Sequence, residues 1–226
     1  YEADDLIGTI SVQALGGPVR SFPPASAPSI SSVSSAGSVR AVGSPSSSAT
    51  PNNIEVYIVS GDRDLLQLVN GQVKMIAPVT GLTNMIIYDS AKVEEKFGIK
   101  PSQIVDYKAL VGDASDNYPG VAGVGPKTAA SLLNEYGSLE NIYKNLEKIK
   151  AKNPNLALKL AEGAEAAGLA QKLAGIVLNA PINLDIEKAS LRSFDKEGLK
   201  KEFEKFGFKS LLKRVSSSSA IAKKVT

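Results

Sequence analysis

The pattern of apolar and polar positions predicts strands in the early part of the chain. The run EVYIVS at 55–60 predicts a buried strand, and DLLQLV at 64–69 predicts a turn of helix directly after it. VKMIAP at 73–78 and TNMIIYD at 83–89 predict two more strands. The short connection Val79-Thr80-Gly81-Leu82 separates these two, so we expect a hairpin or adjacent strands.

Helical patterns dominate after residue 90. SAKVEEKFG ends in Gly98, which we expect to cap a helix, and SQIVDYKALVG at 102–112 has one apolar face. Further helices are predicted over 126–136, 138–149, 154–178 and 195–214. This order of elements favours an α/β layer followed by an all-α module, with the division near residues 90–100.

Three segments stand apart from this pattern. YEADDLIGTI at 1–10 has the character of a helix interior, so we expect the chain to be a fragment of a longer protein. Residues 21–50 hold 12 serines and four prolines without an acidic residue, which predicts a disordered insertion at about 14–52. It could be a tolerated surface loop or could carry phosphorylation or a peptide motif. Residues 215–226 are predicted to form a disordered tail.

Composition limits the chemistry that the chain can perform. The 226 residues carry a net charge of +3, include 43% hydrophobic residues, and contain neither cysteine nor histidine. Thiolate and imidazole metal sites, disulfides and a Ser-His-Asp triad are therefore excluded within this sequence. Any metal must be bound by oxygen ligands. No apolar run approaches the roughly 20 residues of a membrane helix, so we expect a cytoplasmic protein with no membrane partner.

Acidic residues gather in three short motifs. The motifs comprise Glu2, Asp4 and Asp5 in the first helix, Asp62 and Asp64 after the first strand, and Asp113 and Asp116 in VGDASDNYPG. If these carboxylates share one cleft, their mutual repulsion requires divalent cations. Mg²⁺ or Mn²⁺ fits oxygen ligands. Two such ions roughly 4 Å apart can activate a water and stabilise the leaving oxygen of a phosphodiester.

Each acidic motif also has a purely structural interpretation. The first could be the solvated face of a helix, the second could cap the N-terminus of a helix, and the third could cap the following turn. All three motifs lie beside apolar runs and small residues, and this favours the shared cleft.

A glycine-rich hairpin follows the third acidic motif. Glycines at 120, 123 and 125 predict a tight turn, and Pro126 suits the first position of a helix. Gly123, Gly125, Lys127 and Thr128 are therefore candidates for gripping the phosphates of one nucleic-acid strand without reading its bases. The order GxxGxG differs from the dinucleotide-binding fingerprint. A merely structural pair of helices is the alternative.

Four segments together resemble a known family. YEADDLIGT, IVSGDRDLLQLV, DYKALVGDASDNYPGVAGVGPKTAASLLNEYGSLENIY and FGFKSLLKR resemble the 5′→3′ exonuclease domain of bacterial DNA polymerase I, one of the flap-endonuclease-like nucleases. The resemblance covers residues 1–10 and about 54–214. It implies a PIN-like α/β/α sandwich, incomplete at its N-terminus, over 1–98. It further implies an all-α helix–three-turn–helix, or helix-hairpin-helix, DNA-binding module over 99–214.

The resemblance also implies an activity and its site. It implies metal-dependent hydrolysis of DNA at 5′ ends, flaps and duplexes in replication and repair, with two divalent ions and a hairpin loop that can bind K⁺. The implied metal ligands are Glu2, Asp4, Asp5, Asp62, Asp64, Asp113 and Asp116. Among these, we assign the reaction itself to Asp4, Asp5, Asp62 and Asp113. In the family, a first strand ending in a metal-binding aspartate, a second acid and a basic helical arch precede the residue equivalent to Tyr1.

The given sequence does not include these upstream family features, so we expect impaired activity from the fragment alone. We also expect a polymerase as a partner, either acting in trans or as a further domain of the parent chain. Two other functions stay open. One is a DNA-binding module without catalysis, and the other is an RNA-directed nuclease on the same fold, because residue types alone do not separate DNA from RNA.

Overall fold

A computed structural model describes residues 1–16, 54–80, 84–190 and 195–217. The predicted insertion from residue 17 onward and the predicted tail from residue 218 onward lie outside these ranges. The chain forms two compact units, Tyr1–Asn183 and Leu184–Thr226, and each is described by itself. The predicted division between residues 98 and 99 stays a prediction.

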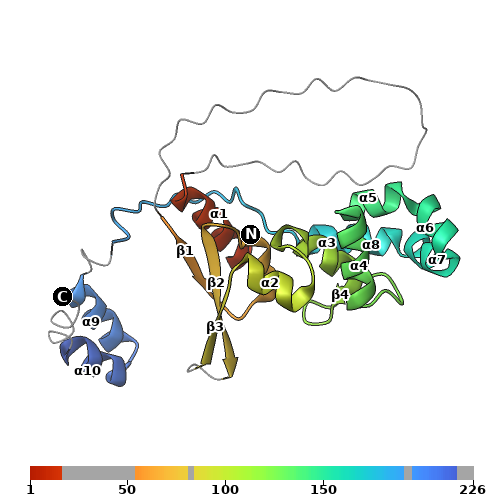
Figure 1. Cartoon of the computed structure of the whole chain (residues 1–226). Helices are drawn as coiled ribbons and strands as arrows, with labels where there is room; N and C mark the ends of the chain where they lie inside the picture. Colours follow the sequence, from red (N-terminus) through yellow and green to blue (C-terminus); the bar gives the residue numbers. More distant parts are fainter. Residues whose placement is uncertain (17–53, 81–83, 191–194, 218–226) are drawn as a thin grey trace. The chain divides into compact units, whose positions relative to one another are not determined.

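A three-stranded sheet forms the α/β part of the first unit. Strand β1 (Val56–Val59) runs parallel to β2 (Val73–Thr80), and β2 pairs antiparallel with β3 (Asn84–Tyr88) (Figure 1). The 3₁₀ helix η1 (Arg63–Leu68) lies in the connection from β1 to β2. The predicted strand pair β2–β3 and the helical turn after β1 are confirmed.

The prediction that the first strand is buried is wrong for one of its faces. Only Ile58 of β1 is buried, whereas Tyr57 and Val59 are 44% and 66% exposed. β1 is an edge strand of this sheet, and successive side chains of a strand point to opposite faces. Met85 and Ile87 of β3 are also exposed, and their pairing register places them on the same face as Tyr57 and Val59.

Helices α2 and α3 connect the sheet to the helical part. α2 (Ser90–Phe97) ends at Gly98, whose φ of 68° is left-handed, as expected of a glycine cap. After the short 3₁₀ helix η2 (Pro101–Gln103), α3 (Ile104–Val111) buries Ile104, Ala109 and Leu110. α3 packs against α4 (Pro126–Tyr136) and α8 (Ala164–Ala174), so it forms the centre of the helical part.

Two of the predicted helices are each divided into two. Residues 138–149 form α5 (Leu139–Lys144) and the beginning of α6 (Leu146–Lys152), with Asn145 between them. The segment predicted at 154–178 forms α7 (Pro154–Glu162) and α8, which ends at Ala174. Gly163 separates α7 from α8, and a Cβ at this position would lie 2.8 Å from the Val121 side chain. The chain therefore bends where it packs on the glycine-rich hairpin.

Helix α1 (Ala3–Ala14) is held by a segment that lies about 170 residues further along the chain. The Thr9 hydroxyl accepts a hydrogen bond from the Ala180 amide at 3.0 Å, and the Gln13 side chain donates to the Ile182 carbonyl at 2.8 Å. α1 also contacts η1 and β1. These contacts bring the acidic start of α1 to the same part of the fold as η1.

The second unit contains a helical hairpin. α9 (Lys196–Lys205) and α10 (Lys209–Ser217) replace the single helix predicted at 195–214, because Gly207 adopts a left-handed φ of 69° between them. The Phe208 ring lies 6.0 Å from that of Phe203 and 5.8 Å from that of Phe206. Across the described ranges, no helix combines the length and apolar character needed to span a bilayer.

Candidate metal centre

A very tight hairpin positions the third acidic motif. Strand β4 (Gly112–Asp113) pairs antiparallel with β5 (Tyr118–Pro119). A Cβ added to Gly120 would lie 2.3 Å from the Gly112 nitrogen, and one added to Gly112 would lie 2.4 Å from the Gly120 nitrogen. Only glycine fits at both positions without moving the backbone. We call this close approach of the two backbones the Gly112–Gly120 crossing. It fixes where the turn that carries Asp113 and Asp116 begins and ends.

The second acidic motif is positioned by the start of η1. Asp62 accepts a hydrogen bond from the Asp64 amide at 3.0 Å, so the expected N-cap is present. The Gln67 side chain donates to the carbonyls of Asp64 at 2.9 Å and Ala174 at 2.8 Å, and it accepts from the Ile176 amide at 3.1 Å. Gln67 therefore fixes η1 to the end of α8, and with it the backbone of Asp64.

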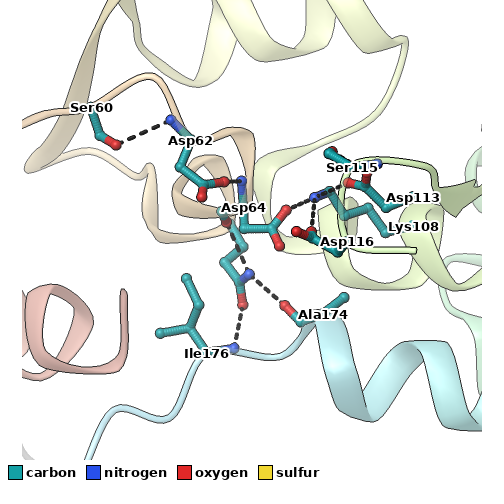
Figure 2. Close-up of polar contacts among 10 residues, drawn as sticks. Ser60, Asp62, Asp64, Lys108, Asp113, Ser115, Asp116, Ala174 and Ile176 are labelled. Carbon is teal, nitrogen blue, oxygen red and sulfur yellow. Dashed lines mark hydrogen bonds and ion pairs between the residues drawn. The ribbon is translucent and has the colours of Figure 1, made fainter. Parts of the chain in front are cut away.

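These elements bring three carboxylates together. One oxygen from each of Asp64, Asp113 and Asp116 lies within 4.8 Å of the other two, which is the spacing of ligands around a single cation. Figure 2 shows Lys108 of α3 pointing into this group. Its ammonium forms an ion pair with Asp64 and lies 2.6 Å from Asp113 and 4.0 Å from Asp116. We call these four residues the carboxylate–lysine cluster.

The carboxylate–lysine cluster opens on a cavity of about 430 Å³. Its wall includes Asp62, Arg63 and Ser115 in addition to Lys108, Asp113 and Asp116. The Asp113 and Asp64 side chains are only 16% and 14% exposed, while Asp116 is 51% exposed. The donor set is made of hard oxygen atoms around a solvent-connected space. It therefore fits a divalent ion that keeps part of its water shell.

Electrostatic shifts connect the three acidic motifs. Burial raises the pKa of Asp113, but hydrogen bonds from Lys108 and Ser115 outweigh it and hold this pKa at about 2. Burial and then the negative charges of Asp62, Glu2, Asp5 and Asp116 raise the pKa of Asp4. The charges of both other acidic motifs therefore act on the Asp4 carboxylate. Its oxygens are nevertheless not among the grouped oxygens of Asp64, Asp113 and Asp116.

The other two acids of the first motif, Asp5 and Glu2, take part in hydrogen bonds at the start of α1. One Asp5 oxygen accepts from the Val177 amide at 2.8 Å, and the other accepts from the Glu2 amide at 3.0 Å. These bonds hold the start of α1, and each carboxylate oxygen retains a further lone pair for a metal. Glu2 is exposed and forms a capping box with Asp5. The roles of Glu2, Asp4 and Asp5 as ligands stay predictions.

The pKa of Asp113 gives the metal-free protein an acid-sensitive stability. A carboxyl whose folded pKa lies below its ordinary value of 3.8 stabilises the fold above pH 3.8. This contribution is lost as the pH falls from 3.8 to about 2. We expect the urea midpoint of the wild type to fall more steeply than that of Asp113→Asn between pH 5 and pH 2.5. Parallel curves for the two proteins would contradict the shift.

The predicted strand-gripping residues lie at the beginning of α4. Gly125 is its extended N-cap residue, Lys127 is exposed in the first turn, and Thr128 is half-buried. Val121 and Val124 are buried and anchor the loop, which leaves Gly123 and Gly125 exposed. The structure thus presents these four candidates on one short surface segment, and their contact with nucleic acid stays a prediction.

Sequence reasoning missed Lys108 and Gln67 as parts of the site. Both are polar residues inside helical segments that are otherwise largely apolar, DYKALV and DLLQLV. A lysine one turn before Asp113 on a largely buried helix needs an anionic partner, because an unpaired buried charge is costly. That argument could have found Lys108 and its neighbour Asp113, but Asp64 comes from a distant segment and could not be assigned.

Comparison with known proteins gives a family match for part of the chain. Residues 99–197 match the family described as 5′-3′ exonuclease, C-terminal SAM fold. The chain is therefore similar to the 5′-3′ exonuclease family over this helical module, and the relatives below extend the similarity beyond it, as the four motifs indicated.

The relatives include both a separate nuclease and much longer polymerases. The chain is 38% identical to the 5′-3′ exonuclease of Mycoplasma pneumoniae over 176 residues, which cover 77% of this chain and 60% of that protein. It is 42% identical over 170 residues to DNA polymerase I of Caldicellulosiruptor bescii, and these cover 74% of this chain and 20% of that protein. The chain thus spans only a part of the relatives that it matches.

Solved structures support the fold. The T5 D15 protein co-crystallised with metal ions superimposes with a TM-score of 0.51 at 17% identity, over 78% of this chain and 50% of that chain. At this level of identity the likeness concerns the fold. It confirms the predicted class, in which an α/β part precedes a helical module.

Proposed function

We propose that the protein is a 5′-nuclease that hydrolyses DNA phosphodiesters at 5′ ends and flaps with divalent metal ions. The observation that carries this proposal is the convergence of Asp64, Asp113 and Asp116 beside a cavity that Asp113 and Asp116 line, in a chain that matches the 5′-3′ exonuclease family over residues 99–197. The T5 D15 flap endonuclease, which has a similar fold, was crystallised with DNA and metal ions. DNA replication and repair in the cytoplasm are the proposed setting, because the relatives include bacterial DNA polymerase I.

Two Mg²⁺ or Mn²⁺ ions are the proposed cofactors. Asp64, Asp113 and Asp116 would hold one ion, and Asp62 would contact it through water from the cavity wall. Asp4 and Asp5 on α1 are the proposed ligands for the other. When bound, such ions lower the pKa of a water and stabilise the leaving oxygen. The protein contributes rigid placement, since Gln67 and the Gly112–Gly120 crossing hold the backbones of the two acidic turns.

The loop before α4 is the proposed contact for the DNA backbone. Amides at a helix N-terminus and the Lys127 ammonium attract phosphates without reading bases. A K⁺ ion at this loop is also proposed, and it would compete with the Lys159 ammonium, which lies 3.4 Å from the Gly123 carbonyl.

A cleavage assay tests the proposal. The longest natural form of the protein that contains this chain is incubated with a 5′-flap duplex, with Mg²⁺ and with EDTA. We expect cutting near the flap junction only with Mg²⁺. Binding without any cutting would instead support a DNA-binding module, and preferential cutting of the matching RNA flap would support an RNA-directed nuclease. Cutting that persists in EDTA would refute the metal-dependent mechanism.

Lys127 should contribute to affinity without affecting sequence preference. We expect Lys127→Ala to weaken binding to all DNA sequences about equally and to reduce the slope of log affinity against log salt by about one. Fluorescence anisotropy at several salt concentrations measures both quantities. Lys92→Ala is the matched control, because Lys92 is a lysine on α2 that pairs with Glu95. Equal slopes for the wild type and Lys127→Ala would remove Lys127 from the interface.

A further inference from the structure

Lys108 occupies the centre of the proposed metal site. Its side chain is only 11% exposed, and its ammonium reaches all three carboxylates of the cluster. The distances of 2.6 Å to Asp113 and 4.0 Å to Asp116 place a positive charge between ligands that would otherwise face one another. Figure 2 shows the carboxylates of Asp64, Asp113 and Asp116 arranged around this single nitrogen.

The positive charge has a clear physical role in the metal-free protein. Three carboxylates whose oxygens lie within 4.8 Å of one another repel strongly in a partly buried site. One ammonium offsets part of this repulsion and supplies hydrogen-bond donors to oxygens that are largely removed from water.

The same placement excludes a divalent ion from this position. Mg²⁺ binds oxygen ligands at about 2.0–2.1 Å, so a bound ion would need the carboxylate oxygens that now contact the ammonium. Two cations at such short range repel each other. The ammonium and the metal therefore compete for one set of ligands.

We propose that Lys108 is an internal counter-ion that holds the carboxylate cluster together without metal and that a divalent ion must displace. This inference rests on the proposed metal-dependent function and adds a coupling to it. Metal affinity is lower than the three carboxylates alone would give, because part of the binding free energy is spent on separating Lys108 from them. The cavity of about 430 Å³, whose wall includes Lys108, provides space into which the side chain can move.

Removing the charge should therefore strengthen metal binding. We expect Lys108→Met to bind Mn²⁺ at least about tenfold more tightly than the wild type, since coupling between two sites typically changes affinity 5- to 150-fold. The metal-free variant should unfold at a lower temperature, and Mn²⁺ should raise its midpoint by more than it raises that of the wild type. Lys108→Arg keeps the charge and should stay close to the wild type in Mn²⁺ affinity.

A measurement on the wild type avoids any dependence on folding of the variants. Displaced lysine should react faster with acetic anhydride, so we expect Mn²⁺ to raise the acetylation rate of Lys108 several-fold, measured by mass spectrometry. Exposed Lys148 on α6 should be unaffected and serves as the internal reference.

The outcomes separate this inference from the proposed function. If the wild type binds Mn²⁺ and cuts the flap, but Lys108→Met binds Mn²⁺ no more tightly and Lys108 acetylation is unchanged, the counter-ion role is refuted and the nuclease stands. If the wild type binds no Mn²⁺ by electron paramagnetic resonance, the metal site and the proposed function fail together. Tighter binding in Lys108→Met, with faster acetylation of Lys108 in the wild type, supports the displacement.

Discussion

Replacing Asp113 by Asn is expected to lower the rate of flap cleavage in Mg²⁺ by at least about a hundredfold, because a metal ion contributes several kcal/mol to such a reaction. The substitution removes a charged ligand but keeps the shape of the side chain. The oxygen that accepts the Ser115 amide hydrogen bond at 2.8 Å can be retained by the Asn carboxamide. The loss should therefore reflect chemistry at the cluster rather than collapse of the β4–β5 turn.

The matched control for this experiment is Asp89→Asn. Asp89 is the N-cap residue of α2, where it accepts from the Lys92 amide at 2.8 Å, and Asn is an equally good N-cap. Cleavage rates under single-turnover conditions should be the same for Asp89→Asn and the wild type. If Asp113→Asn cut the flap as fast as this control, Asp113 would have no part in the reaction.

Replacing Gly120 by Ala is expected to cost about 3 kcal/mol of unfolding free energy and to abolish metal binding. The added Cβ would lie 2.3–2.4 Å from backbone atoms of Gly112, Leu110 and Val111, and backbone cannot move aside as a flexible side chain can. Relief requires the crossing of β4 and β5 to open. The turn that carries Asp113 and Asp116 would then lose its position.

Gly71→Ala tests whether the effect belongs to the crossing. A Cβ at Gly71 would meet nothing within 4 Å, so its unfolding free energy should stay within about 0.5 kcal/mol of the wild type. Thermal unfolding with and without Mn²⁺ measures stability and metal binding together. If Gly120→Ala unfolded at the wild-type temperature, β4 and β5 could move apart at Gly120 without loss of unfolding free energy, and the prediction would be wrong.

Local features of the fold could be predicted from the sequence because they depend on neighbouring residues. The β2–β3 pair, the glycine cap at Gly98 and the bounds of α4 follow from alternation, backbone freedom and the position of Pro126. The division of 138–149 and 154–178 into shorter helices could not be predicted in this way. Gly163 breaks its helix where Val121 packs, and that contact joins residues 42 positions apart.

The acidic residues of the site could be predicted, but their arrangement could not. Carboxylates near strand ends and small residues indicated a metal site, and three of the seven do meet there. The insertion of Lys108 and the tethering of α1 through Thr9 and Asp5 depend on contacts between distant segments. The exposure of Tyr57 and Val59 likewise depends on how much of that sheet face other segments cover, since Met85 and Ile87 of β3 are exposed on the same face, and one strand's own pattern does not reveal this.

The β4–β5 hairpin joins the carboxylate–lysine cluster directly to the glycine loop. Only six residues separate Asp116 from Gly123, and the Val121 amide is bonded to the Leu110 carbonyl at 2.8 Å between them. In the proposed nuclease, a short stretch of covalent chain would therefore set the spacing between the bond to be cut and the phosphate bound at the glycine loop. Changes in flap length would then alter how often such an enzyme cuts but not at which nucleotide.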